Sequence, residues 1–246
     1  MPTPGEGAFA ANKHPEFESA AATPAVVGDA IHKFGSAVIR GGLEQDFANQ
    51  IRATVVRGFE LQDRAIQLGQ VPTTDRAVLD DRLGISQFAQ LPGGAALLQQ
   101  LVQHRLMHLM QGYLGPKLQL MVNRSVIRRQ KPSGTTSHTP FHQDGEFLER
   151  GRPIIVCWIA LDPCGVDAPG LELVTEGVGG LLPTAERNSG GAYDSIELDE
   201  DAIVARFGRE KLWHPAFQAG DVGLMTDHAI HRTYVTATMT ATRHTL

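Results

Sequence analysis

Cysteine is scarce in this chain of 246 residues. It has only Cys157 and Cys164, which are too few for a disulfide framework and lack CxxC spacing. Long apolar runs are absent, since no window approaches the roughly 18 consecutive apolar residues that a membrane-spanning helix needs. The N-terminus also lacks the basic start and continuous apolar run of a signal peptide. We therefore expect a cytoplasmic protein with reduced thiols and no membrane partner.

An excess of basic residues is missing as well. Lys and Arg number 22 against 27 for Asp and Glu, which gives a formal net charge of −5 and disfavours nucleic acid as a partner. The chain is 42% hydrophobic and 20% charged, close to globular averages, so a folded core is expected. The Pro, Ala and Gly content of residues 1–24 predicts a flexible arm, and residues 25–246 are expected to form a single domain.

The first half of the chain has mainly helical periodicity. Residues 34–43 fit a short strand that ends in a Gly-Gly turn, and apolar residues near helical spacing predict helices over 43–68 and 94–115. His104 and His108 lie four apart on the second of these helices. Because no acidic residue accompanies them, we interpret them as surface or boundary histidines rather than as a metal site.

From about residue 117 the pattern changes to short β-rich runs separated by Pro, Gly and Asp. A polar and acidic stretch at about 185–212 interrupts these runs and is interpreted as an insertion, with one helix in 199–208. Helices followed by many short strands predict an α+β fold that is mainly β, with a sandwich or barrel as its second part. The β-rich runs are residues 118–129, 152–161, 170–174, 219–225 and 229–235.

The stretch TPFHQDGEF (139–147) places His142 and Asp144 two residues apart in a run that fits a strand. Side chains at i and i+2 of a strand point to the same face, so both groups can reach one point in space. His228 or His231, from a later strand, can supply a third ligand. Two histidines and one carboxylate on one face of a metal, with open positions opposite, form the facial triad of non-haem Fe(II) oxygenases.

Arg243 and Thr233 fit the binding of a co-substrate at such a metal. If 2-oxoglutarate chelates the iron through its keto acid, its far carboxylate needs a fixed cation, and a guanidinium offers a bidentate fork. Arg243 follows His231 by twelve residues, so a hairpin would return it beside the metal strand. Thr233 points to the same strand face as His231 and can add a hydroxyl group.

As a set, these motifs resemble the phytanoyl-CoA dioxygenase family of Fe(II)/2-oxoglutarate oxygenases over residues 34–246. The distance from Gly220 to His231 also fits the family, which favours His231 over His228 as the third ligand. The residues that carry the resemblance are His142-Gln143-Asp144, CWIALD with Trp158, APGLELV at 168–174, PAFQAGDVGLM at 215–225, His231, Thr233 and Arg243.

The resemblance implies a double-stranded β-helix (a jelly-roll, cupin-like barrel) with the N-terminal helices packed on one sheet. It implies Fe(II) bound by His142, Asp144 and His231, 2-oxoglutarate bound by Arg243 with Thr233 and Trp158, and O2 as a further co-substrate. The implied reaction hydroxylates a small organic substrate at an unactivated C–H bond. Halogenation is disfavoured, because halogenating relatives replace the carboxylate by a small residue and Asp144 is intact.

Several polar residues around the His-x-Asp motif are candidates for substrate binding. Alternation places Arg128 on the same strand face as Gln130, and Arg150 follows the motif closely, so we name these three for an anionic substrate. Two alternative functions stay open. One is a cupin-like metal enzyme that uses the same three ligands without 2-oxoglutarate, and the other is a non-catalytic barrel that binds a small molecule.

Overall fold

The computed structural model describes residues 14–70, 87–133, 138–148, 152–185 and 194–246. Its helices are α1 (Pro24–Phe34), α2 (Gln45–Gln67), α4 (Gly94–Gln103), α5 (Arg105–Leu114) and α6 (Glu200–Phe207). Its strands are β1 (Glu16–Glu18), β2 (Ser36–Arg40), β3 (Arg128–Gln130), β4 (Ile155–Ile159), β5 (Gly170–Val174), β6 (Leu212–Trp213), β7 (Val222–Thr226), β8 (His231–Tyr234) and β9 (Arg243–Thr245). The described residues therefore form a mixed α+β fold, as predicted. The expectation that the fold is mainly β is wrong, because more of the described residues lie in helices than in strands.

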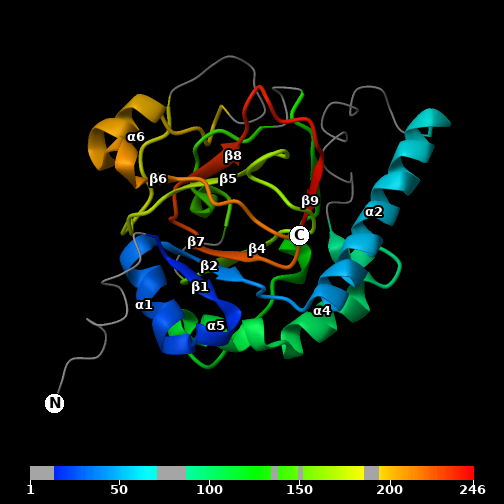
Figure 1. The fold of residues 1–246 in the computed structure, drawn as a ribbon, viewed down its shortest axis with the longest axis horizontal. Helices are drawn as coiled ribbons and strands as arrows, with labels where there is room; N and C mark the ends of the chain where they lie inside the picture. Colours follow the sequence, from blue (N-terminus) through cyan, green and yellow to red (C-terminus); the bar gives the residue numbers. More distant parts are fainter. Residues whose placement is uncertain (1–13, 71–86, 134–137, 149–151, 186–193) are drawn as a thin grey trace.

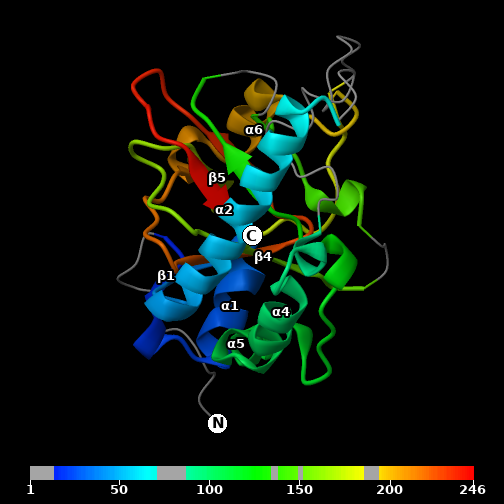
Figure 2. The ribbon, with the colours of Figure 1, turned by 90° about the vertical axis from the view of Figure 1, so that its right-hand side faces the viewer.

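Two sheets lie one above the other, with α1, α4 and α5 below them and α2 on the right (Figure 1). A four-stranded sheet has the order β1-β2-β7-β4, in which β1 and β2 are parallel and the other pairs antiparallel. A three-stranded antiparallel sheet has the order β6-β5-β8, and β3 and β9 form a separate antiparallel pair. Helices α1 and α5 lie below the four-stranded sheet, and Figure 2 shows α2 lying along another side, where it contacts β9.

Alternation along the strands divides the core into two parts. On β2, Ile39 belongs to the cluster shared with the helices, whereas Val38 belongs to the cluster shared with β5. On β7, Leu224 and Met225 divide in the same way. Successive residues of a strand point to opposite faces, so each of these strands contributes apolar side chains to both clusters. This explains why the sequences of β2 and β7 are nearly continuous apolar runs.

Helix α1 was not among the predicted elements, although its local signals are present. The Thr23 side chain accepts a hydrogen bond from the first turn, Pro24 is the first helical residue, and Gly35 ends the helix at φ 74°. Before it, β1 pairs with β2 and a 3-10 turn follows. Ordered structure thus replaces the predicted arm within residues 14–24, while residues 1–13 lie outside the described residues.

The single helix predicted over 94–115 is wrong, because the chain forms two helices there. They meet at His104, whose backbone is extended at φ −72° and ψ 151°. Its ring accepts a hydrogen bond from the Leu106 N–H (3.1 Å) and so caps α5, and the other ring nitrogen lies 2.7 Å from the Glu44 carboxylate. A side-chain cap therefore interrupts a pattern of apolar residues that continues across the break.

The β-rich run predicted at 118–129 is wrong for most of its length, since only its last two residues belong to a strand, β3. Residues 122–124 form a 3-10 turn instead. The predicted helices at 43–68 and 199–208 are confirmed by α2 and α6, and the other predicted strand runs contain β2, β4, β5, β7 and β8. Within the described part of the chain, no helix is long and apolar enough to cross a membrane.

Candidate metal centre

Three side chains from two distant parts of the chain converge on one point. The ligand atoms of His142, Asp144 and His231 all lie within 4.8 Å of one another, and all three residues are buried. Nε2 of His142 lies 3.5 Å from one oxygen of Asp144, and Nε2 of His231 lies 3.8 Å from the other. Two imidazoles and one carboxylate at this spacing can share a small cation.

Backbone pairing sets the positions of the two histidines. His142 and His231 form an antiparallel bridge in which each N–H donates to the carbonyl of the other, at 3.0 and 3.1 Å. Residues directly opposite in such a pair point to the same face, and the two ring centroids are 4.2 Å apart. The bridge therefore brings both imidazoles to one side of the paired strands.

Asp144 reaches the same point from a tight turn rather than from the predicted strand. It is the first residue of a 3-10 turn, Asp144–Glu146, in which the Gly145 N–H donates to the Asp227 carbonyl at 2.7 Å. A Cβ at Gly145 would lie 3.1 Å from that carbonyl oxygen and 2.9 Å from the Leu181 side chain. The turn that directs Asp144 toward the histidines thus favours glycine at the next position.

Two backbone carbonyls fix the tautomers of the imidazoles. Nδ1 of His142 lies 2.8 Å from the Pro140 carbonyl oxygen, and Nδ1 of His231 lies 3.0 Å from that of Ala229. A carbonyl can only accept a hydrogen bond, so each Nδ1 carries the proton and each Nε2 presents its lone pair toward Asp144. Histidines that bind metals are commonly oriented by such a hydrogen bond from the other ring nitrogen.

The charge state of the cluster also fits a divalent cation. Burial alone would raise the pKa of Asp144, but His231, His142 and the charge of Arg128 lower it to about 2. Burial and the neighbouring His142 lower the pKa of His231 to about 4, against the opposing effect of Asp144. At neutral pH, Asp144 is therefore ionised and His231 is neutral, which are the forms that bind a metal ion.

Gln143 lies between two of the candidate ligands and is buried away from them. Its side chain donates to the carbonyls of Gly180 (3.1 Å) and His228 (2.7 Å) and accepts from the Leu182 N–H (2.7 Å). These bonds tie the His-x-Asp segment to two other parts of the chain. The ring of His228, the alternative third ligand, is partly exposed and does not belong to the cluster.

Arg243 is a buried cation whose hydrogen-bonding capacity is only partly used. Its guanidinium lies 5.0 Å from the centre of the Trp158 ring, and Nη2 donates to the Gln130 side-chain oxygen. Nε and Nη1 are buried without a nitrogen or oxygen partner among the described residues, and the nearby Cys164 thiol is a weak acceptor. Burial lowers the pKa of Arg243 to about 10, so it stays charged at neutral pH. Such a group fits a carboxylate ligand.

Gln130 links Arg243 to the strand that carries His231. Its Nε2 donates to Oγ1 of Thr233 (3.1 Å), which also accepts from the Thr139 N–H (3.2 Å). Gln130 faces Arg243 directly across the β3–β9 pair. Of the three predicted substrate residues, the structure thus places Gln130 against Arg243 and Thr233, two of the three residues predicted to bind 2-oxoglutarate. Arg128 lies beside it on β3, and Arg150 lies outside the described residues.

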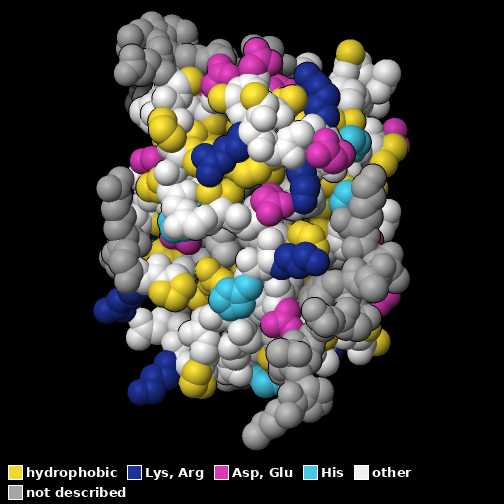
Figure 3. Space-filling view, turned by 90° about the vertical axis from the view of Figure 1, so that its left-hand side faces the viewer, with side chains coloured by type: hydrophobic (Ala, Val, Ile, Leu, Met, Phe, Trp, Pro, Cys, Tyr) yellow, Lys and Arg dark blue, Asp and Glu magenta, His cyan; other side chains and the backbone are white. Residues whose placement is uncertain are grey.

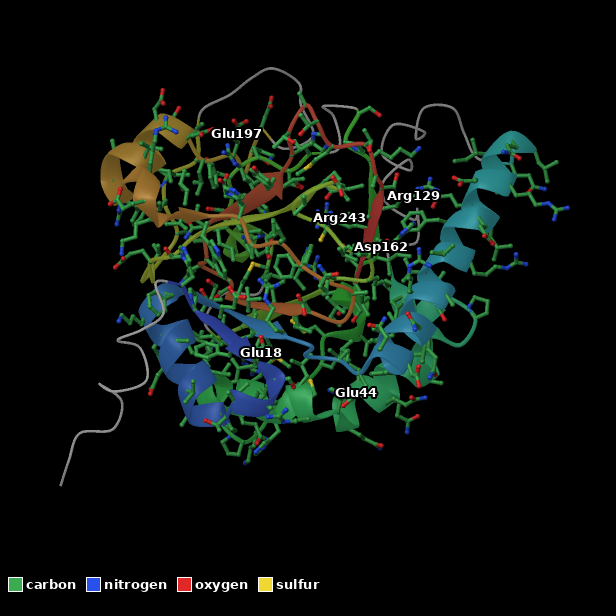
Figure 4. All side chains as sticks on the ribbon, viewed as in Figure 1. Glu18, Glu44, Arg129, Asp162, Glu197 and Arg243 are labelled. Atoms are coloured by element: carbon green, nitrogen blue, oxygen red, sulfur yellow. The ribbon has the colours of Figure 1, made fainter. Side chains whose placement is uncertain are left out.

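Asp162 holds the strand of Arg243 from outside the site. Its carboxylate accepts hydrogen bonds from the His244 N–H (2.7 Å), from the His244 ring (2.7 Å) and from Nε of Arg52 on α2 (2.6 Å). Burial opposes these bonds, which nevertheless lower the pKa of Asp162 to about 2. Figure 4 shows Asp162 close to Arg243, and Arg129 on the side toward α2. No local motif marks this support, because its members are far apart in sequence.

The sequence matches the profile of the family described as phytanoyl-CoA dioxygenase (PhyH) over residues 31–177, which is more than half of the chain. The chain belongs to this family. Comparison with curated protein sequences gives no significant match.

Solved structures show that the fold of this phytanoyl-CoA dioxygenase family member is shared with non-haem enzymes. The non-haem monooxygenase ThoJ has a TM-score of 0.60 at 16% identity, over 89% of this chain and 74% of that chain. The non-haem α-ketoglutarate-dependent carbocyclase SnoK from nogalamycin biosynthesis has a TM-score of 0.60 at 15% identity, over 89% and 81%. EvdO2 from Micromonospora carbonacea var. aurantiaca, solved with 2-oxoglutarate, has a TM-score of 0.55 at 13% identity, over 89% and 86%.

Proposed function

We propose that this protein is an Fe(II)- and 2-oxoglutarate-dependent dioxygenase that hydroxylates a small organic substrate at an unactivated C–H bond. In this proposal His142, Asp144 and His231 bind the iron, and Arg243, with Thr233 and Trp158, binds the far carboxylate of 2-oxoglutarate. One observation carries it: two imidazoles and one carboxylate meet at one point, and a buried guanidinium with unpaired N–H groups lies on a strand linked to that of His231. The assignment is supported by SnoK, which is α-ketoglutarate-dependent, and by EvdO2, which was solved with 2-oxoglutarate.

When bound, iron with 2-oxoglutarate and O2 supplies the oxidising power, and succinate and CO2 are the by-products. The protein's own residues bind and orient. The Nδ1 bonds of His142 and His231 restrain the imidazoles, so both lone pairs point to the metal position. Three ligands on one side leave the opposite positions open. Gln130 and Trp158 hold the Arg243 guanidinium in place, which sets the direction in which a dicarboxylate can lie.

We also propose that the sheets form a double-stranded β-helix. This is supported by the two sheets that share an apolar cluster and by the bridges that tie them to neighbouring segments, His142 to His231 and Ala160 to Thr245. A cytoplasmic location is supported by the free thiols of Cys157 and Cys164. The face in Figure 3 shows basic and acidic side chains interspersed, which supports a small-molecule substrate over nucleic acid.

An anaerobic titration with Fe(II) and 2-oxoglutarate, followed by visible absorbance, tests the function. We expect a weak charge-transfer band that disappears in His142→Ala and needs more 2-oxoglutarate in Arg243→Ala. Arg124→Ala, an exposed arginine near β3, is the matched control and should leave the band unchanged. Succinate release in air then screens candidate substrates.

The same titration separates the two alternative functions. Iron bound without the band would favour a cupin-like enzyme that does not use 2-oxoglutarate. Iron and 2-oxoglutarate bound without succinate release, across a broad range of substrates, would favour a non-catalytic barrel.

A further inference from the structure

Arg128 lies on the inner face of β3. Arg129 faces outward, where its guanidinium makes two hydrogen bonds to the Asp63 carboxylate of α2, at 2.6 and 2.8 Å. Gln130 faces the opposite way and bonds to Thr233 and Arg243. Because side chains alternate along a strand, Arg128 shares the inward face with Gln130. Consistent with this position, its charge lowers the pKa values of Asp144, His231 and Arg243.

The Arg128 side chain also differs from other partly buried arginines, because it has no carboxylate partner. Within the described part of the chain, Arg40, Arg129 and Arg232 are likewise partly buried, and each is paired with a carboxylate at 2.7 Å or less. Among the described residues, the Arg128 side chain makes no hydrogen bond and no ion pair. The guanidinium nitrogens of Arg128 are not among the buried unpaired atoms of the described residues, so they are open to an anion that arrives from outside.

The charges around the centre indicate how much negative charge that anion carries. Arg128 and Arg243 contribute one positive charge each and Fe(II) contributes two. Asp144 contributes one negative charge and 2-oxoglutarate two. One positive charge is left over, and a singly charged anion would neutralise it.

We propose that Arg128 binds the carboxylate of the primary substrate, and that this substrate is a small organic monocarboxylate. The proposal rests on the proposed function. The planar guanidinium matches a carboxylate in a two-bonded arrangement, which fixes the orientation of the substrate as well as its affinity. Phe147 is 42% exposed, and its ring lies 6.3 Å from that of His142, so it offers an apolar surface near the metal position for the rest of the substrate.

Binding of simple probes to the protein loaded with Mn(II) and saturating 2-oxoglutarate under argon tests the proposal without turnover. The probes are acetate, butyrate and benzoate, each compared with its neutral amide, and methyl phosphate. We expect at least one carboxylate to bind, with its amide at least tenfold weaker. Arg128→Gln should weaken that carboxylate at least tenfold and leave 2-oxoglutarate affinity within twofold. Arg124→Gln, the matched control, should change neither affinity.

Three results would overturn the proposal. Carboxylates could bind no better than their amides, or Arg128→Gln could bind carboxylates as tightly as the wild-type protein. The third result is an Arg128→Gln variant that loses affinity for 2-oxoglutarate instead of affinity for the carboxylate. If methyl phosphate binds more tightly than every carboxylate, the anionic group of the substrate is not a carboxylate. The proposed function fails separately, if the wild-type protein binds neither Mn(II) nor 2-oxoglutarate. In that case carboxylate binding to the metal-free protein, with and without Arg128→Gln, still decides the role of Arg128.

Discussion

At the scale of single residues, the candidate site depends on side chains that orient Arg243 and its strand through hydrogen bonds. Gln130 contacts both Arg243 and Thr233, and Asp162 contacts the residue that follows Arg243. The hydrogen bonds described for Gln130 and Asp162 lead to Thr233, Arg243 and His244 rather than to the three candidate metal ligands. Their replacement should therefore change co-substrate binding or stability while leaving iron binding intact.

Gln130→Met should weaken 2-oxoglutarate binding about tenfold, because one hydrogen bond of about 1–1.5 kcal/mol no longer orients the Arg243 guanidinium. Iron affinity should stay within twofold. The concentration of 2-oxoglutarate that half-saturates the visible band measures the effect. Equal half-saturation in the variant and the wild-type protein would show that Arg243 is held without Gln130.

Asp162 should make the free energy of unfolding depend on pH in the acidic range. Its folded-state pKa of about 2 lies below the ordinary 3.8, so its contribution is complete above about pH 4 and is lost as the pH falls through 2. Between these limits, the difference in unfolding free energy between wild type and Asp162→Asn should shrink, by at most about 1.4 kcal/mol per pH unit. Urea unfolding from pH 6 to pH 2 measures it. A difference that stays constant over this range would contradict the assignment.

Sequence reasoning identified His142, Asp144 and His231 because their signals are local or have a fixed spacing. A single residue separates His142 from Asp144 along a strand-like run, and a Gly-Asp turn precedes His231. The role of Gln130 was not predictable in the same way. It depends on the β3–β9 register, which pairs residues more than 100 positions apart, and no local pattern encodes that pairing.

At the scale of elements, α1 and α5 pack so closely that only glycine fits at their contact. A Cβ at Gly112 would lie 1.6 Å from the Pro24 carbonyl oxygen, and a Cβ at Gly28 would lie 2.5 Å from the Gly112 carbonyl oxygen. The two helices thus meet backbone to backbone. Their packing anchors the N-terminal segment on the helical side of the four-stranded sheet.

Gly112→Ala should lower the free energy of unfolding by about 1–3 kcal/mol, because the helices must separate to admit the methyl group. This is expected although alanine favours an isolated helix by roughly 1 kcal/mol. Gly179→Ala is the control, since a Cβ at that position meets nothing within 4 Å, and it should change stability by less than about 0.5 kcal/mol. Urea denaturation of both variants tests the contact, and equal stabilities would refute it.

The predicted elements were correct where a long or strongly patterned segment decides the structure by itself. The apolar spacing of α2 extends over 23 residues and gives a clear helix. The break at His104 could not be read from that kind of pattern, because it depends on a side-chain cap and on a contact with Glu44. The three residues of β3 are likewise too few for periodicity to specify a strand.

At the scale of the whole molecule, the candidate metal ligands lie on two segments that are far apart in the sequence. His231 begins β8 in the three-stranded sheet, and His142 and Asp144 lie in a connecting segment before β4. A bound ion would join these segments and stabilise the folded state by mass action, since the unfolded chain does not keep the three ligands together.

Mn(II) at one hundred times its dissociation constant should stabilise the protein by about 2.7 kcal/mol, which raises the melting temperature by about 5–10 °C. EDTA should reverse the shift. His142→Ala should abolish it, whereas His108→Ala, which removes an exposed histidine of α5, should keep it. A similar shift in His142→Ala would locate the metal elsewhere.

The bridge between His142 and His231 also sets a time at which the ion can be acquired. His231 is synthesised long after His142 and Asp144. Its imidazole is positioned by the backbone hydrogen bonds between His231 and His142. A nascent chain that has emerged only as far as β7 has no complete site, so loading must follow the synthesis and docking of β8. If the bound ion is iron, as proposed, its supply would act on a nearly finished protein, and a shortage would leave completed chains with an empty site.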